Sequence, residues 1–347
     1  MLRSSPIVEA CNPMQPMLPY YHPTTCLVVD DDTLFLESFA HRYGDTVLCA
    51  TQANPKTAIE RLRAQTRMHA TSAPSVHSPI SALPDGLSED GDALFRVETS
   101  SILQIARRLE RFSHISTIII DYAMPAMSGL DVCRSIKDLP VKKILLTGMA
   151  GDSTAVDAFN EGLIDFFLVK QDARLSERLP VEVDRLQREY FAQRTAGIEP
   201  ISRTDDAAFL RDPTLVGWLE GLSKDVGAVE HYLMAITPGL MLVDQNGKAT
   251  LAYVFSADRM RAQREIALHE GAPAALIARL EAGKTLLVCP SQTGYYDSRF
   301  AATWTKYAHD AVPAGGASAW QASVNFASAV DLRQASLRHY RNTRRGA

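Results

Sequence analysis

The fold is decided by the stretch Thr117-Ile-Ile-Ile-Asp121-Tyr-Ala-Met-Pro125-Ala-Met-Ser-Gly129-Leu130. Three β-branched isoleucines lead straight into Asp121, and a loop that contains Pro125 and Gly129 follows. A short, continuous apolar run of this kind predicts a strand buried on both faces, as in a parallel sheet. Open α/β sheets place their ligands at the carboxyl ends of such strands. We therefore expect Asp121 to be a reactive carboxylate that the surrounding chain holds in place.

Length and composition predict a soluble, cytoplasmic protein of two domains. The chain has 347 residues, of which 46% are hydrophobic and 22% charged, as is ordinary for a globular protein. Its net charge of −4 provides no overall field that would attract nucleic acid or membrane. The 5 cysteines lie far apart without a CxxC pair, which favours a reducing compartment over a disulfide framework or a zinc cluster. We find no signal peptide and no membrane-spanning run, so no membrane insertion is expected.

Further apolar runs alternate with segments of helical spacing. The apolar runs cover residues 26–29, 46–50, 143–147 and 165–169, and the helical segments begin near residues 33, 54, 100, 130 and 154. Strands that alternate with helices in this way predict an α/β fold built on a doubly wound, five-stranded parallel sheet.

Composition also divides the chain into parts. Residues 1–23 are rich in Pro and Met without periodicity, so we expect a flexible tail. The first domain is expected over residues 24–195, with a surface insert at about 66–112 beside its second helix. Residues 196–347 are expected to form a smaller α+β domain. Its clearest element is a hairpin over residues 240–255 with an Asn246-Gly247 turn, and a late helix is expected from about Val324 to Arg341.

Polar residues stand at the ends of four predicted strands: Asp30 and Asp31, Asp121, Thr147 with Gly148, and Lys170. The carboxyl ends of parallel strands share one edge of the sheet, so these side chains can converge. Clustered carboxylates repel unless a cation intervenes, and Mg²⁺ prefers such oxygen ligands. Lys170 offers a positive charge to a phosphate, Thr147 offers a hydroxyl donor, and Gly148 leaves room for a backbone N–H. Asp121 is therefore a candidate nucleophile that forms an aspartyl-phosphate.

Each of these residues has an ordinary structural role when it is considered alone. An aspartate after a strand is usually a turn or capping residue, and Asp32 is expected to cap the helix that follows it. Thr147 or Lys170 by itself indicates nothing. The functional prediction rests on their joint occurrence, each at the end of its own strand.

Residues 25 to about 190 resemble a response-regulator receiver domain of bacterial two-component signalling. The matching motifs are Leu-Val-Val-Asp30-Asp31-Asp32, Ile-Ile-Ile-Asp121-Tyr-Ala-Met-Pro125-Ala-Met-Ser-Gly129, Ile-Leu-Leu-Thr147-Gly148 and Phe167-Leu-Val-Lys170. The resemblance implies a flavodoxin-like sheet with strand order 2-1-3-4-5. It implies phosphorylation of Asp121 by a sensor histidine kinase or a phosphotransfer protein. We also expect the chain to form a homodimer on phosphorylation.

The same resemblance implies a role for each site residue. Mg²⁺ would be held by Asp30, Asp31, Asp121 and the backbone carbonyl of Ala123. Thr147, Lys170 and the backbone of Gly148 would contact the phosphoryl group, and Phe167 would stand at the aromatic switch position. No enzymatic activity is expected beyond phosphoryl transfer to the protein's own aspartate and slow autodephosphorylation.

The chain departs from the family pattern in three places. The insert lengthens the segment between Asp30 and Asp121, and Gln171 follows Lys170 where the family commonly has Pro. Ala123 and Met149 stand two residues beyond the acceptor and the threonine, and neither side chain can orient a hydrolytic water. We therefore expect a long-lived phosphate.

The output function stays open at the level of sequence. A ligand- or protein-binding output that relays the signal through dimerisation is favoured, because we find no helix-turn-helix, P-loop or other catalytic signature. The alternatives are a DNA-binding regulator that contacts phosphates through Arg338, Arg341, Arg344 and Arg345, and an output that binds a nucleotide or small ligand or is an enzyme. The plan of a long insert without a helix-turn-helix resembles response regulators of α-hydroxyketone quorum sensing.

Overall fold

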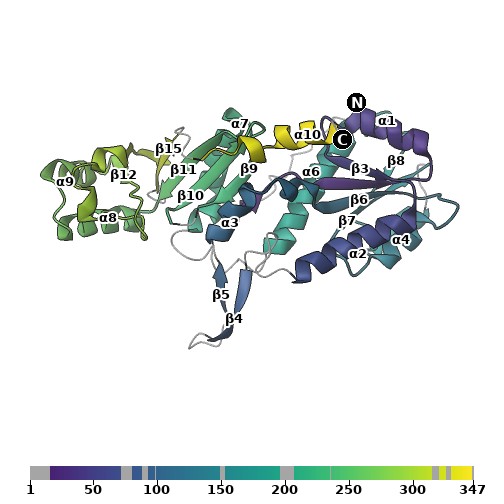
Figure 1. The fold of residues 1–347 in the computed structure, drawn as a ribbon, viewed down its shortest axis with the longest axis horizontal. Coiled ribbons are helices and arrows are strands. Elements are labelled where there is room, and N and C mark those ends of the chain that lie inside the picture. The colour runs from purple at the N-terminus through teal and green to yellow at the C-terminus, as the bar shows by residue number, and fades with distance from the viewer. Residues whose placement is uncertain are drawn as a thin grey trace, which may run out of the picture.

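The computed structural model describes residues 16–71, 80–87, 93–97, 99–148, 153–195, 207–234, 236–314, 320–325 and 330–345. Figure 1 shows an elongated molecule in which a parallel sheet, an antiparallel sheet and a small helical lobe follow one another along the long axis. Near the carboxyl terminus, helix α10 (Leu337–Arg345) returns to the parallel-sheet end, where Leu337 shares a hydrophobic cluster with Leu48.

The first sheet is parallel and has five strands in the order β3-β2-β6-β7-β8. In the order of the chain this is 2-1-3-4-5, so the predicted fold class and topology are confirmed. The strands are β2 (Thr25–Val29), β3 (Cys49–Gln52), β6 (Ile115–Asp121), β7 (Lys142–Thr147) and β8 (Phe166–Val169). Every residue of β6 and β7 is buried, as expected for central strands that are covered on both faces.

Five helices cover the two faces of this sheet: α1 (Thr33–Tyr43), α2 (Pro55–Thr71), α4 (Gly129–Ser135), α5 (Ser153–Asn160) and α6 (Leu175–Thr195). Helices α1 and α6 share a hydrophobic core with Ile119 of β6, whereas α2, α4 and α5 share the other core with Ile118 and Ile120. The alternation of these three isoleucines follows from the two-residue period of a strand. The run of three isoleucines before Asp121 therefore contributes to both cores of the parallel sheet.

The second sheet is antiparallel, with the strand order β1-β9-β10-β11-β15-β14. Its strands are β1 (Tyr20–Tyr21), β9 (Ala228–Leu233), β10 (Gly239–Asp244), β11 (Ala249–Phe255), β14 (Val312–Ala314) and β15 (Trp320–Asn325). The predicted hairpin is confirmed by the pairing of β10 with β11. Its turn holds Gly247 at φ +81°, and a Cβ there would lie 2.5 Å from the carbonyl oxygen of Leu332, so glycine is required.

The remaining elements lie around the second sheet or beyond it. Helices α3 (Thr99–Ala106) and α7 (Pro213–Asp225) and the turn η4 (Ala208–Arg211) flank the sheet, and the hairpin of β4 (Ile80–Leu87) and β5 (Ala93–Val97) projects from the body (Figure 1). The far lobe holds α8 (Ala257–His269), α9 (Ala274–Glu281), β12 (Thr285–Leu287), η5 (Ser298–Phe300), η6 (Trp304–Lys306) and β13 (Ala308–Asp310). The last elements are η7 (Arg333–Ala335) and α10 (Leu337–Arg345), and η1 (Leu109–Ser113) precedes β6.

The structure corrects the prediction of a flexible tail at its end. Tyr20 and Tyr21 form β1, pair with Tyr232 and His231 of β9, and are buried. A strand of two residues has no periodicity that a sequence could display, so only its pairing partner reveals it. Of the predicted tail, residues 1–15 lie outside the described residues.

The predicted late helix is also wrong in its first part. Val324 lies in β15 and pairs with Ala252 of β11. The helix begins only at Leu337. The segment around Val324 is rich in Ala and Ser and is compatible with either helix or strand, and the open edge of β11 decides for the strand.

Part of the expected surface insert packs into the hydrophobic core of the antiparallel sheet. Ile102, Ile105 and Ala106 of α3 are buried against residues of the second sheet, and so are Tyr190 and Phe191 of α6. The antiparallel sheet therefore takes its core from residues on both sides of the predicted domain boundary at residue 195.

Candidate functional site

The carboxyl edge of the parallel sheet brings together the polar residues that the sequence singled out. Asp30 follows β2 directly, Asp121 ends β6, Thr147 ends β7 and Lys170 follows β8. Because the four strands run in parallel, these residues share one edge of the sheet. Asp30, Asp121 and Thr147 are each at least 94% buried, at 1%, 6% and 1% exposure. The site is therefore preformed by the sheet rather than by a loop.

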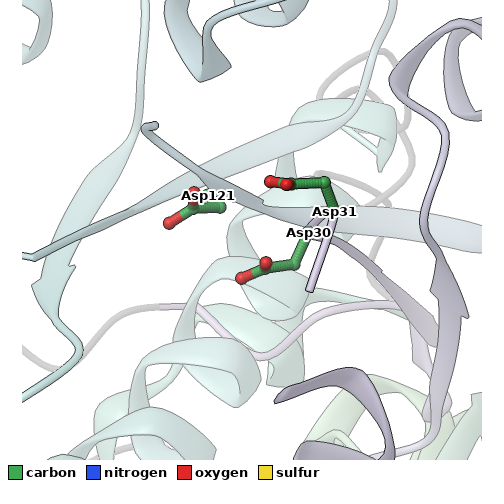
Figure 2. A group of neighbouring side chains, drawn as sticks. All are labelled: Asp30, Asp31 and Asp121. Atoms are coloured by element: carbon green, nitrogen blue, oxygen red, sulfur yellow. The ribbon is translucent and has the colours of Figure 1, made fainter. Parts of the chain in front are cut away.

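Three carboxylates form the acidic part of the site. Carboxylate oxygens of Asp30, Asp31 and Asp121 all lie within 4.8 Å of one another, and Figure 2 shows the three side chains grouped at this edge. Asp31 is exposed, whereas the other two are buried, so the cluster opens to solvent on one side. Hard oxygen ligands with access to water are what Mg²⁺ requires. The residues present thus fit that ion.

Lys170 joins the two buried carboxylates. Its Nζ lies 2.6 Å from Asp30 Oδ2 and 2.7 Å from Asp121 Oδ1. Burial disfavours the ammonium, but hydrogen bonds to Asp121 and Asp30 outweigh this and raise the pKa of Lys170 above its ordinary value. The lysine therefore carries its charge at neutral pH and can face a phosphoryl group.

Lys170 does not fully compensate the cost of burying the Asp30 carboxylate. Burial raises the pKa of its carboxyl group, although hydrogen bonds from Lys170 and from the amide of Asp32 act in the opposite direction. Further positive charge beside Asp30 would stabilise its ionised form. This observation, together with the oxygen donor set, supports a divalent cation at the cluster.

The backbone around the acids fixes their orientation. Asp30 Oδ1 accepts a hydrogen bond from the amide of Asp32 at 2.9 Å, and Asp32 in turn caps α1 as predicted. The amide of Ala123 donates to Asp121 Oδ2 at 3.0 Å, so both oxygens of the acceptor carboxylate are engaged. The carbonyl of Ala123 as a metal ligand stays a prediction.

Gly129 lies where the loop after Asp121, the acceptor loop, passes close to the end of β6. Its amide donates to the carbonyl of Tyr122 at 3.0 Å. A Cβ at Gly129 would lie only 2.4 Å from the carbonyl oxygen of Asp121 and 2.9 Å from Leu145 Cδ1. The loop can therefore return to the end of β6 only because this residue lacks a side chain.

The remaining predicted contacts lie around the site. Gly148 is exposed, and among the described residues no atom beyond its chain neighbours lies within 4 Å of where its Cβ would stand. The Phe167 ring is half-buried and makes an edge contact with Phe159 of α5, with ring centroids 6.5 Å apart. Met149 lies outside the described residues.

The four arginines predicted to contact nucleic acid are not brought to this site. They belong to α10, whose Leu337 and Tyr340 pack against Leu48 and Phe112 beside the parallel sheet. Arg338 and Arg344 are exposed and Arg341 is half-buried, whereas the side chain of Arg345 lies outside the described residues. The helix is therefore docked by one face and presents only part of its positive charge.

Sequence reasoning missed Phe35. Its ring lies beneath the Lys170 ammonium, with Nζ 4.4 Å from the ring centroid. Phe35 looks like one of several apolar residues of α1, and no local signal distinguishes it. The contact becomes visible only when the fold brings Lys170, which follows β8, over Phe35 of α1.

Comparisons with known proteins agree with this geometry. A model described as "Response regulator receiver domain" matches residues 87–179. The Response regulator protein TodT of Pseudomonas putida is 32% identical over 93 residues, which cover 23% of this chain and 41% of that protein. The match thus spans about two fifths of the relative's length.

One solved structure extends the likeness over most of the chain. The structure of the Legionella pneumophila response regulator LqsR aligns with 89% of this chain and 90% of its own, at 23% identity and a TM-score of 0.66. At this identity the likeness establishes the fold alone. Among the described residues, no helix combines the length and the apolar character that crossing a membrane would need.

Proposed function

The chain contains a response-regulator receiver domain, and from this premise we propose that Asp121 accepts a phosphoryl group from a sensor histidine kinase or a phosphotransfer protein in a Mg²⁺-dependent reaction. The observation that carries the proposal is the position of Lys170 between Asp30 and Asp121, at 2.6 and 2.7 Å. A structural ion pair needs one carboxylate. A lysine shared by two buried carboxylates, with a third within 4.8 Å, is organised for a phosphate and a cation.

The chemistry follows from the residues present. A carboxylate oxygen of Asp121 attacks the phosphorus, the bond from phosphorus to the donor nitrogen breaks, and the donor leaves with the electron pair. Bound Mg²⁺ would supply charge neutralisation for the carboxylates and the phosphoryl oxygens. Lys170 offers a second positive charge, and Thr147 and the amide of Gly148 offer donors. Ala123 has no group that could activate water, which supports a long-lived phosphate.

Dimerisation is the proposed relay. Val156 and Phe159 of α5 and Val181 of α6 are 41%, 45% and 65% exposed. They flank β8, where Phe167 lies. Movement of Thr147 toward the phosphoryl group would let the Phe167 ring repack against Phe159 and change this apolar surface, which a second copy of the chain would then cover. Phosphorylation would thus be read as a change in oligomeric state.

The output is proposed to bind a ligand or a protein rather than DNA. The apolar face of α10 already packs against Leu48 and Phe112. In the described part of residues 196–347, the main sheet is antiparallel. We also propose a cytoplasmic location. We further propose a role in α-hydroxyketone quorum sensing, which the long insert and the lack of a recognisable helix-turn-helix motif in the sequence support. If DNA binding is the output instead, Arg338→Ala with Arg344→Ala should weaken salt-dependent binding to generic duplex.

The deciding experiment is labelling of the acceptor. Wild type incubated with acetyl phosphate and Mg²⁺ should gain one phosphoryl group by intact mass, and Asp121→Asn should not. Omission of Mg²⁺ should suppress labelling, and light scattering with beryllofluoride should report dimerisation. Equal labelling of wild type and Asp121→Asn would refute the mechanism.

A further inference from the structure

Lys170 is held on three sides. Two contacts are the carboxylates of Asp30 and Asp121, and the third is the face of the Phe35 ring, 4.4 Å from Nζ to the centroid. The lysine side chain is 24% exposed, so solvent reaches it only in part. An ammonium is a compact, strongly hydrated charge on a flexible stem and does not keep one position by itself. The ring is a third neighbour of the ammonium beside the two carboxylates.

Phe35 is itself fixed by the same short segment that supplies the acids. Asp32 Oδ1 accepts hydrogen bonds from the amides of Leu34 and Phe35, at 2.9 and 3.1 Å, and the amide of Asp32 donates to Asp30 at 2.9 Å. The Phe35 ring also contacts Phe39 one turn further along α1, with centroids 6.0 Å apart. The ring and the acid are thus tied to one capped helix terminus.

The geometry points to Phe35 as a positioning residue for phosphoryl transfer, which holds the Lys170 ammonium by cation–π attraction where it can meet a phosphoryl oxygen on Asp121. This inference rests on the proposed function. A divalent cation held by the acids would compete for the Asp30 carboxylate and would weaken its bond with Lys170. The ring then remains as a support that does not compete with the cation, because it offers no ligand atom.

A simple packing role makes a different prediction. Phe35 also lies against the core that α1 shares with the sheet, so Phe35→Leu alone could act through packing. Progressive fluorination of the ring removes its negative face while its size hardly changes. A series with 4-fluoro-, 3,5-difluoro- and 3,4,5-trifluorophenylalanine at position 35 therefore separates attraction from shape.

The test uses the chain of 347 residues with acetyl phosphate and saturating Mg²⁺. The labelling rate should fall stepwise along the fluorinated series, and Phe35→Leu should lower it by about three- to tenfold, the range expected of a partly exposed cation–π contact. Phe35→Tyr should keep the wild-type rate. Phe166→Leu is the matched control, because that ring packs against the same core and lies beneath a different cation, Arg185.

The outcomes are distinguishable. A flat fluorinated series would overturn the inference even if Phe35→Leu were slow, since packing would then explain the loss. An equal loss in Phe166→Leu would do the same. Failure of wild type to be labelled, or labelling of Asp121→Asn, would instead count against the proposed function itself.

Discussion

At the scale of single residues, the site depends on small groups as much as on its acids. Asp121 keeps its position because Ala123 donates to one oxygen, Lys170 to the other, and Gly129 lets the loop pass close to the acceptor backbone. The motif from Asp121 to Gly129 was visible in the sequence. The reason for its glycine, a carbonyl oxygen 2.4 Å from any Cβ, belongs to the folded loop.

We predict that Gly129→Ala destabilises the protein and slows phosphorylation. The added methyl group would meet the carbonyl oxygen of Asp121, so the acceptor loop must shift, and a loss of about 1–3 kcal/mol in the free energy of unfolding is expected. Chemical denaturation and labelling by acetyl phosphate would measure the two effects.

The matched control for this substitution is Gly221→Ala. Gly221 is exposed on α7, and among the described residues no atom beyond its own helix backbone lies within 4 Å of where its Cβ would stand. Alanine is the better helix former, so this variant should gain up to about 1 kcal/mol. An unchanged unfolding midpoint for Gly129→Ala would show that the loop relaxes without strain.

At the scale of elements, α3 shows that part of the insert is a buried component of the antiparallel sheet's core. The sequence showed its helical spacing, and composition placed it in a surface excursion of the first domain. In the structure, Ile102 and Ile105 are buried in the core of the antiparallel sheet. Helical periodicity reports that one face must be covered, but it does not say by which sheet. The assignment of α3 therefore required the tertiary structure.

We expect Ile105→Ala to cost about 2–5 kcal/mol of unfolding free energy, as for other large-to-small changes in a core. Ile105 is 1% exposed. Gln104→Ala on the exposed side of the same helix should change stability by less than about 0.5 kcal/mol. Thermal or urea unfolding of the two variants decides the point, and similar stabilities would mean that α3 is a dispensable surface helix.

At the scale of the whole molecule, the two sheets are joined at several places in the chain. Strand β1 of the second sheet leads into β2 of the first within four residues, and α6 contributes to the cores of both. Between them lies a fully buried ion pair. Arg111 donates to Glu230 through Nε and Nη2, at 2.8 and 2.9 Å, and to the carbonyl of Ala335 at 2.7 Å.

This ion pair predicts that the two sheets unfold together. Arg111 belongs to the insert, Glu230 to β9, and both side chains are fully buried. Burial raises the pKa of Glu230 although Arg111 opposes the shift, so removal of Arg111 would leave a costly buried acid. Arg111→Met should therefore destabilise the protein by about 3–5 kcal/mol.

The double variant Arg111→Met with Glu230→Met is the control for charge. It removes both partners and should recover a large part of the loss, because no unpaired charge remains. Hydrogen exchange in β6 and β9 should accelerate together in Arg111→Met. Faster exchange in β9 alone would show that the sheets behave as separate cooperative units.

The sequence by itself determined the parallel sheet, its topology by resemblance, and the polar residues at its carboxyl edge. These signals are local: each strand is a continuous apolar run, and each site residue directly follows or ends one. The tertiary structure alone decided that Tyr20 and Tyr21 form an edge strand, that α3 belongs to the second core, and that Phe35 lies beneath Lys170. Each of these depends on which distant surface comes to lie opposite, and a pairing partner far along the chain leaves no periodicity in the sequence around it.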